Sequence, residues 1–402
     1  MSLDLNKIIS QIQNAVDKLL DTSTVQTKKI ENSINIIRTA DPSQLENKRA
    51  TSNTSFLVPR NQGSLSASHK VSYVPHQYNV LAVDGSHIDV DRHLPLECYL
   101  INIGTVIISY GDEPSAILNS YPQLFTAENG LVIRDPDSFR HQRVEGPLLG
   151  ILRTIEELRS LVNLVEGLNN AAPILALVDG SLILWGIIGQ SYPEYIRKFL
   201  LENGLIEILD DLKKLAMTRS LVLAAYVSLP RSTEVSNLLR ISSPRCPYSI
   251  SNCDSNCGSI QFGERSCDDA IGVLDRDIFS AILDKGERSD IFASTLPLVE
   301  SYYRDHSVYF YYLNTGEEIA RIEIPKWVAE NPDLVELTHS MCLDQAKLGH
   351  GYPLAISEAH EQAVVTASDR EEFKILVENA LGDKSLPVYT SLKNQSKKLK
   401  WL

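Results

Sequence analysis

Two copies of the tetrapeptide Val-Asp-Gly-Ser carry the residues of this sequence that are best placed to do chemistry. Asp84 and Asp179 each follow a short apolar run, NVLAV and ILALV, which is typical of a buried strand. Glycine lets the backbone turn after a strand, and α/β sheets bind ligands at such ends. Two neighbouring carboxylates repel one another unless a cation lies between them. The pair predicts an oxygen-rich site for Mg²⁺ or Mn²⁺; an ordinary Asp-Gly turn is the alternative for either copy.

Three further side chains are candidates for the same site. Glu156 and Glu157 lie on a predicted helix just before the second apolar strand, where a third carboxylate would complete a metal cluster. Two solvated glutamates on a helix face are the alternative. His360 lies about two helical turns after Pro353, which favours a helix start. It could bind a metal or transfer a proton, although a hydrogen-bonded structural histidine is the commoner case.

The cysteines do not form a recognisable metal motif. Four of the six lie within one loop-like stretch, namely Cys246, Cys253, Cys257 and Cys267. Their spacing lacks the paired C-x2-C pattern of a strong zinc site. Free thiols are therefore expected there, and a metal site is the less favoured alternative.

Strands and helices are mixed along the chain, and they must position these side chains. Apolar and β-branched runs predict strands at 79–84, 100–110, 174–179 and 221–227, and a hairpin at 308–324. Helical periodicity predicts helices at 147–169, 197–214, 333–347, 354–366 and 369–381. This mixture predicts an α/β fold with at least one antiparallel pair of strands.

The N-terminal residues predict a helical extension before the main domain. Apolar residues at helical spacing predict one helix over 3–20 and a second over 30–37, followed by a polar linker. Their apolar faces must be buried against the core or against a partner subunit. We therefore expect an extension and linker at 1–70, a main domain at 71–390 and a basic tail at 391–402.

Composition and charge narrow the class of protein. The chain has 402 residues, of which 43% are hydrophobic and 22% charged, so it can bury a large core. Its net charge of −13 repels DNA on average, and any contact with DNA must be local. The last ten residues contain four lysines and no acid. Lys397, Lys398 and Lys400 are therefore candidate DNA-binding residues, and a solubilising tail is the alternative.

Several locations and activities find no support in the sequence. There is no apolar run long enough to span a membrane and no signal-peptide pattern at the N-terminus, so a cytoplasmic location is expected. The P-loop, the dinucleotide-binding G-x-G-x-x-G, the G-x-S-x-G elbow and H-E-x-x-H are all absent.

Several ordered segments between residues 77 and 385 make the chain resemble the NurA nuclease family. Three of the similar stretches are LAVDGSH (81–87), the helix ILRTIEELRSL (151–161) with ALVDGSLILW (176–185), and GYPLAISEAHEQAVVTASDR (351–370). Two more look like the bacterial branch of the family, AAYVSLPRSTEVSNLLR (224–240) and DRDIFSAILDKGERSDIF (275–292).

The resemblance implies an RNase H-like mixed central sheet flanked by helices. It also implies a DNA nuclease that depends on Mn²⁺ or Mg²⁺, of the single-strand endonuclease and 5′–3′ exonuclease type. The expected setting is end resection at DNA double-strand breaks, by a homodimer docked on a hexameric HerA-like ATPase. A non-catalytic DNA-binding or regulatory subunit of such a translocase is the alternative.

The resemblance also assigns roles to individual residues. Asp84, Glu157, Asp179 and His360 match the metal ligands, with Glu156 as the fallback for Glu157. His360 could instead donate a proton to the leaving group. Tyr352 matches a further catalytic position, where it would orient the phosphate or the attacking water.

Overall fold

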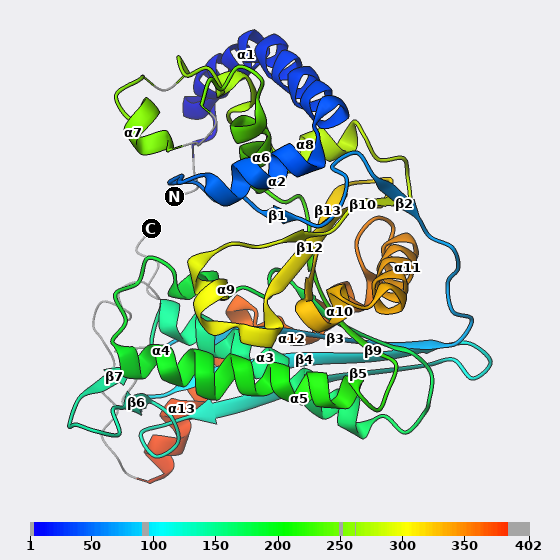
Figure 1. Cartoon of the computed structure of the whole chain (residues 1–402). Coiled ribbons are helices and arrows are strands. Elements are labelled where there is room, and N and C mark those ends of the chain that lie inside the picture. The colour runs from blue at the N-terminus through cyan, green and yellow to red at the C-terminus, as the bar shows by residue number, and fades with distance from the viewer. Residues whose placement is uncertain (1–3, 91–95, 249–251, 262, 385–402) are drawn as a thin grey trace. The chain divides into compact units, whose positions relative to one another are not determined.

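The computed structural model describes residues 4–90, 96–248, 252–261 and 263–384, and it divides into two compact units (Figure 1). Unit 1 comprises Met1–Ser72, Val227–Glu300 and Ser307–Glu323, and unit 2 comprises Tyr73–Tyr226, Ser301–His306 and Ile324–Leu402. The division into an extension, a main domain and a tail stays a prediction, and the basic tail lies outside the described residues. No helix in the described ranges is both long enough and apolar enough to cross a membrane.

Five strands of unit 2 follow the order β9-β8-β3-β4-β5. They are β9 (Leu221–Val227), β8 (Ile174–Asp179), β3 (Tyr78–Ile88), β4 (Tyr99–Tyr110) and β5 (Ser115–Phe125). β3, β4 and β5 pair antiparallel, whereas β8 runs parallel to β3 and β9 runs parallel to β8. This arrangement confirms the predicted RNase H-like mixed sheet. β8 and β9 are almost wholly buried, which is why their sequences are continuous apolar runs.

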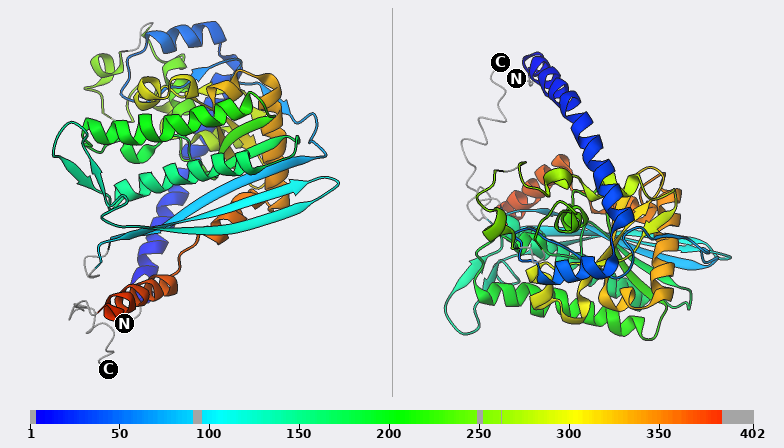
Figure 2. Two further views of the ribbon diagram at one scale, coloured as in Figure 1. Left: turned by 90° about the horizontal axis from the view of Figure 1, so that it is seen from below. Right: turned by 45° about the horizontal axis from the view of Figure 1, so that its top comes forward.

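Helices cover both faces of this sheet in unit 2. The helices are α3 (Pro147–Gly167), α4 (Glu194–Leu200), α5 (Glu207–Ala216), α10 (Lys326–Ala329), α11 (Pro332–Leu348), α12 (Leu354–Ala363) and α13 (Ala367–Asp383). Shorter elements are β6 (Val132–Arg134), β7 (His141–Arg143), a π-helical turn at Leu201–Ile206, and 3-10 turns at Trp185–Ile187 and Arg304–His306. α3 and α5 lie on one face of the sheet and α12 lies on the other (Figure 2). A side chain from either layer can therefore reach the strands.

Unit 1 combines the N-terminal helices with short strands. Its helices are α1 (Asn6–Thr39), α2 (Pro42–Thr51), α6 (Glu234–Ser242), α7 (Cys253–Cys257) and α8 (Asp275–Ser280), with a 3-10 turn at Asp268–Ala270; α9 (Pro297–Tyr302) spans its boundary. Its strands are β1 (Arg60–Asn61), β2 (Ser68–Lys70), β10 (Glu287–Ser289), β11 (Phe292–Ala293) and β12 (Val308–Asn314), and β13 (Ile319–Pro325) belongs to it up to Glu323. Apolar side chains from α1, α6, α8 and β12 meet in one core.

The N-terminus differs from the two helices expected from the sequence. It forms the single helix α1, because nothing between residues 20 and 30 breaks a helix. Ile36 and Ile37 near its C-terminal end are buried in the core of unit 1. Most apolar residues of its first half are instead exposed, namely Ile9, Ile12, Val16 and Leu19, and so is Leu5 just before it. Only the last turns of α1 therefore contribute to the core of this unit.

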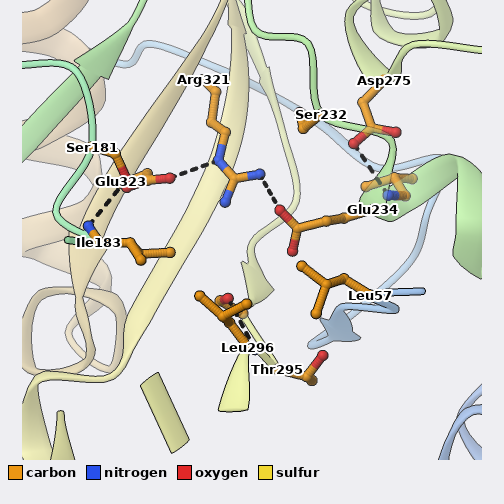
Figure 3. A network of polar contacts seen from close by, with 12 residues as sticks. Leu57, Ser181, Ile183, Ser232, Glu234, Asp275, Thr295, Leu296, Arg321 and Glu323 are labelled. Atoms are coloured by element: carbon orange, nitrogen blue, oxygen red, sulfur yellow. Dashed lines mark hydrogen bonds and ion pairs between the residues drawn. The ribbon is translucent and has the colours of Figure 1, made fainter. Parts of the chain in front are cut away.

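A buried ion-pair network links β13 to α6 within unit 1 (Figure 3). Arg321 donates hydrogen bonds to Glu323 from Nε at 2.9 Å and to Glu234 from Nη1 at 2.6 Å. Its guanidinium carbon lies 3.6 Å from the centre of the Phe310 ring. The three charged side chains are at most 8% exposed. A buried cation with two carboxylate partners is costly to disrupt, because removing it leaves charge that water does not solvate.

Candidate active site

The two aspartates lie next to each other on neighbouring parallel strands. Val83 of β3 pairs in register with Val178 of β8, and the next residues are Asp84 and Asp179. Adjacent strands are about 4.8 Å apart, so these backbone positions are close. The charge of Asp84 also raises the pKa of Asp179, which burial has already raised. The paired carboxylates expected from the sequence are therefore brought together.

The two Asp-Gly-Ser segments nevertheless differ in structure. β8 ends at Asp179, and Gly180 turns the chain with a φ of 88°. β3 instead continues through Gly85 to Ile88, so the expected strand end at Asp84 is wrong. A Cβ at Gly85 would lie 2.5 Å from Glu157 Oε1. Gly85 therefore leaves space for the Glu157 side chain of α3 and does not form a turn.

Glu157 brings a third carboxylate to the aspartates from α3. Its side chain is 13% exposed, and Oε1 lies 3.0 Å from Arg153 Nε one turn earlier. The two groups are not aligned for a hydrogen bond, and Oε1 has no hydrogen-bond partner among the described residues. Burial raises the pKa of Glu157 to about 8, and the charges of Asp84 and Asp179 also raise it. Arg153 opposes this shift without cancelling it.

Glu156 lies apart from these contacts. Its carboxylate forms an ion pair with Arg159 at 3.5 Å, and its side chain is 33% exposed. The structure thus supports Glu157 over Glu156 as the glutamate that accompanies the aspartates.

The raised pKa of Glu157 predicts a pH-dependent stability of the metal-free protein. In the unfolded chain this carboxyl group ionises near 4.5, and in the folded protein near 8. Between these values the folded state holds a proton that the unfolded state has lost, so stability falls as pH rises and levels off above about 8. Thermal unfolding in a chelator should show wild type losing stability relative to Glu157→Gln from about pH 5 to pH 8. Parallel curves for the two proteins would contradict the assignment.

His360 reaches Asp84 from α12, on the other face of the sheet. Its Nδ1 lies 2.8 Å from Asp84 Oδ2, and its side chain is 63% exposed. α12 packs tightly against β4, because a Cβ at Gly104 would lie 2.3 Å from the carbonyl oxygen of Ala359. Ser86 and Asn102 both donate hydrogen bonds to the carbonyl of Ala363 at the end of the helix. The strands thereby fix the helix turn that carries His360.

Tyr352 contacts the second aspartate. Its hydroxyl donates a hydrogen bond of 2.8 Å to Asp179 Oδ1, which lowers the pKa of that carboxyl group against the effect of burial. The ring packs edge-on against Tyr226, with 5.4 Å between the ring centres. Tyr226 is fully buried and pairs with Asp179 across β8 and β9. Tyr352 is thus oriented by the strand beside Asp179.

Each of these three carboxylates contacts a polar side chain. His360 contacts Asp84, Tyr352 contacts Asp179, and Arg153 contacts Glu157. In the described ranges, no group of three or more His, Cys, Asp or Glu side chains is already arranged around a metal position. The donor set still fits a hard divalent cation, because it consists of carboxylate oxygens and one of them, Glu157 Oε1, is buried without a hydrogen-bond partner.

Three residues that position the site were missed from the sequence: Arg153, Tyr226 and Gly104. Arg153 precedes Glu157 by four residues on α3, a spacing that places both on one helix face and could have been recognised. Tyr226 and Gly104 lie in strands whose pairing partners the sequence does not reveal.

A family model for the NurA domain matches residues 78–365. Among solved structures, the chain is similar to an Argonaute from Aquifex aeolicus, with 12% identity and a TM-score of 0.26, over 73% of this chain and 29% of that one. It is also similar to a prototype foamy virus protease-reverse transcriptase, with 15% identity and a TM-score of 0.21, over 39% of this chain and 18% of that one.

A third solved structure is LC9-RNase H1, a type 1 RNase H with the type 2 active-site motif. Identity is 7% and the TM-score is 0.20, over 42% of this chain and 71% of that one. The chain thus spans less than a third of the Argonaute and of the viral protein. Among the curated proteins, none matches it.

Proposed function

Because the chain belongs to the NurA domain family, we propose that it is a nuclease that hydrolyses DNA with the help of a divalent cation. The observation that carries this proposal is that Asp84 and Asp179 follow residues that pair in register on neighbouring strands. The charges of both aspartates also act on the Glu157 carboxyl group. Three neighbouring carboxylates repel one another, and a cation between them relieves that repulsion.

Asp84, Glu157 and Asp179 would hold the cation, with His360 beside them. Mn²⁺ or Mg²⁺ suits such oxygen ligands, and a bound cation makes a water nucleophilic and stabilises the leaving oxygen. The protein's own part is to place the carboxylates. The pairing of β3 with β8 places Asp84 and Asp179 on neighbouring strands. Glu157 extends from α3 through the space that Gly85 leaves free.

His360 and Tyr352 act on this cluster from its rim. His360 orients Asp84 through their 2.8 Å contact and is exposed enough to reach a bound strand. In the proposed reaction it serves as a ligand or as the proton donor to the leaving group. Tyr352 holds Asp179 and would position the phosphate or the attacking water.

Replacing His360 with alanine is expected to lower the cleavage rate by about tenfold to a hundredfold, because Asp84 loses the group that orients it. A pH–rate profile separates the two possible roles of His360. If His360 is a metal ligand, its ring must be neutral, so activity falls at low pH and excess Mn²⁺ restores it. A proton donor must be charged, so activity falls as pH rises. His141→Ala, an exposed histidine on β7, is the matched control. A wild-type rate and profile for His360→Ala would leave His360 with a structural role only.

The substrate and partners are proposed from the family. We propose single strands and duplex ends of DNA as substrates, in end resection at double-strand breaks, and a homodimer docked on a HerA-like hexameric ATPase. Light scattering of the purified protein, alone and mixed with such an ATPase, tests both assemblies. A protein that is monomeric and does not bind the ATPase would contradict this part of the proposal.

The proposed DNA contacts of Lys397, Lys398 and Lys400 predict a salt-dependent affinity. Replacing all three with glutamine should weaken binding at low salt and reduce the slope of log affinity against log salt by about two to three, because each phosphate contact releases a counterion. Fluorescence anisotropy with labelled single-stranded DNA measures both quantities. An unchanged slope would show that the tail does not contact phosphates.

The proposal as a whole is tested by cleavage of labelled single-stranded DNA with the purified chain and added Mn²⁺. Cleavage that a chelator abolishes supports it. DNA binding without cleavage at any divalent metal concentration would instead favour a non-catalytic subunit of a translocase.

A further inference from the structure

The four cysteines between residues 246 and 267 converge in unit 1. A single cavity of about 20 Å³ is lined by four thiols and two arginines, namely Cys246, Cys253, Cys257, Cys267, Arg240 and Arg265. A space of this size holds roughly one water molecule, so it suits a single ion better than a larger cluster. None of the four cysteines forms a disulfide.

The local fold explains why these thiols meet. Cys253 and Cys257 are the first and last residues of α7, and a spacing of four places them on one helix face. Burial raises the pKa of Cys253, and so do its neighbours Cys267, Cys257 and Cys246. Each of the other three thiols is thus close enough to Cys253 to affect it electrostatically.

Two arginines supply positive charge beside the thiols. The Nε atoms of Arg240 and Arg265 are buried and have no hydrogen-bond partner within the described part of the chain. Arg240 is held over the Phe56 ring, 4.5 Å from its centre. Burial raises the pKa of Cys267, and the charge of Arg240 opposes this shift. Burial favours the neutral thiols, whereas a positive charge beside them favours the thiolates that bind a metal.

We propose that Cys246, Cys253, Cys257 and Cys267 bind one structural Zn²⁺ ion. A zinc ion with four thiolates carries a charge of −2, and the guanidinium groups of Arg240 and Arg265 lie beside the thiols. Arg240 also forms a buried ion pair with Asp268 at 3.3 Å, so it offsets only part of that charge. The thiols are not yet arranged around a common point, because no metal-ready group exists in the described ranges. Half-exposed cysteines on a five-residue helix can turn inward to the Zn–S distance of about 2.3 Å.

The ion would fasten the segment from Cys246 to Cys267 onto α6. Among the described residues of that segment, α7 is a helix of only five residues and none of them is buried. A metal would therefore supply stability that these side chains do not. The cysteines are separated by six, three and nine residues, which is not a known zinc-binding spacing. The site is therefore not recognisable in the sequence, and only the fold shows that the four thiols are close together. The expectation of free thiols is replaced by this proposal.

Metal analysis of the full chain, purified under reducing conditions without a metal-affinity tag, tests the proposal. Elemental analysis by inductively coupled plasma mass spectrometry should find about one zinc ion per chain. The Asp84→Asn/Asp179→Asn variant should retain it, which separates this ion from any cation at the nuclease site. Cys253→Ser/Cys257→Ser should lose zinc by more than about tenfold, whereas Cys342→Ala, a buried cysteine on α11, should not.

If the serine variant does not fold, Co²⁺ binding to the wild-type protein tests the proposal instead. Wild-type protein stripped of zinc should take up one Co²⁺ with the intense visible absorption of tetrahedral thiolate ligation, and its melting temperature should rise. Iron with acid-labile sulfide, retention of zinc by the serine variant, or a stripped protein that gives no such absorption would each overturn the proposal.

Discussion

Replacing Asp84 or Asp179 with asparagine is expected to lower DNA cleavage by about a thousandfold, since metal-assisted stabilisation of the transition state contributes several kcal/mol. The fold should persist, because removing one of three mutually repelling carboxylates relieves repulsion in the metal-free protein. Cleavage of labelled single-stranded DNA at saturating Mn²⁺ measures the loss, and circular dichroism checks the fold.

A matched pair of variants on α3 serves as the control. Glu157→Gln should show a comparable loss of cleavage, whereas Glu156→Gln, one residue away and paired with Arg159, should retain the wild-type rate. Wild-type cleavage by a well-folded Asp84→Asn or Asp179→Asn protein would remove the carboxylate cluster from the mechanism.

Replacing Arg321 with methionine is expected to destabilise the protein by about 3–5 kcal/mol, the usual cost of leaving a buried ion pair without one partner. Glu234 and Glu323 would then be buried carboxylates without their cation. Phe310 would also lose the guanidinium group above its ring. Urea unfolding followed by circular dichroism measures the change.

The triple variant Arg321→Met, Glu234→Gln, Glu323→Gln separates charge from packing. It removes all three charges together, so much of the lost stability should return. A single Arg321→Met variant as stable as wild type would show that the network contributes little. A triple variant no more stable than the single one would place the loss in packing against Phe310.

The sequence predicts best those elements whose burial is continuous. β8 and β9 have the expected bounds, because strands covered on both faces must be apolar throughout. The sequence also predicts five site residues, and pairwise contacts and electrostatic coupling connect them in the fold: Asp84, Asp179, Glu157, Tyr352 and His360. Their chemical roles stay predictions.

The sequence fails where a neighbouring element decides the structure. β5 does not follow from the sequence, because nine of its eleven residues are exposed and its polar and apolar residues do not alternate regularly. All eleven residues are held by pairing with β4. The sequence predicts a turn at Gly85, whereas the structure keeps this residue in β3, where it leaves space for Glu157. The four cysteines around α7 show no metal motif, because their proximity depends on how the loop folds.

The most direct test of the carboxylate cluster is a calorimetric titration of Mn²⁺ into the metal-free full chain, with zinc content held constant. The wild-type protein should bind Mn²⁺, and binding should strengthen as pH rises to about 8, because Glu157 must lose its proton. The Asp84→Asn/Asp179→Asn variant should show no binding in the same range. Equal Mn²⁺ binding by both proteins, or none by wild type, would contradict the proposal that these carboxylates hold the catalytic cation.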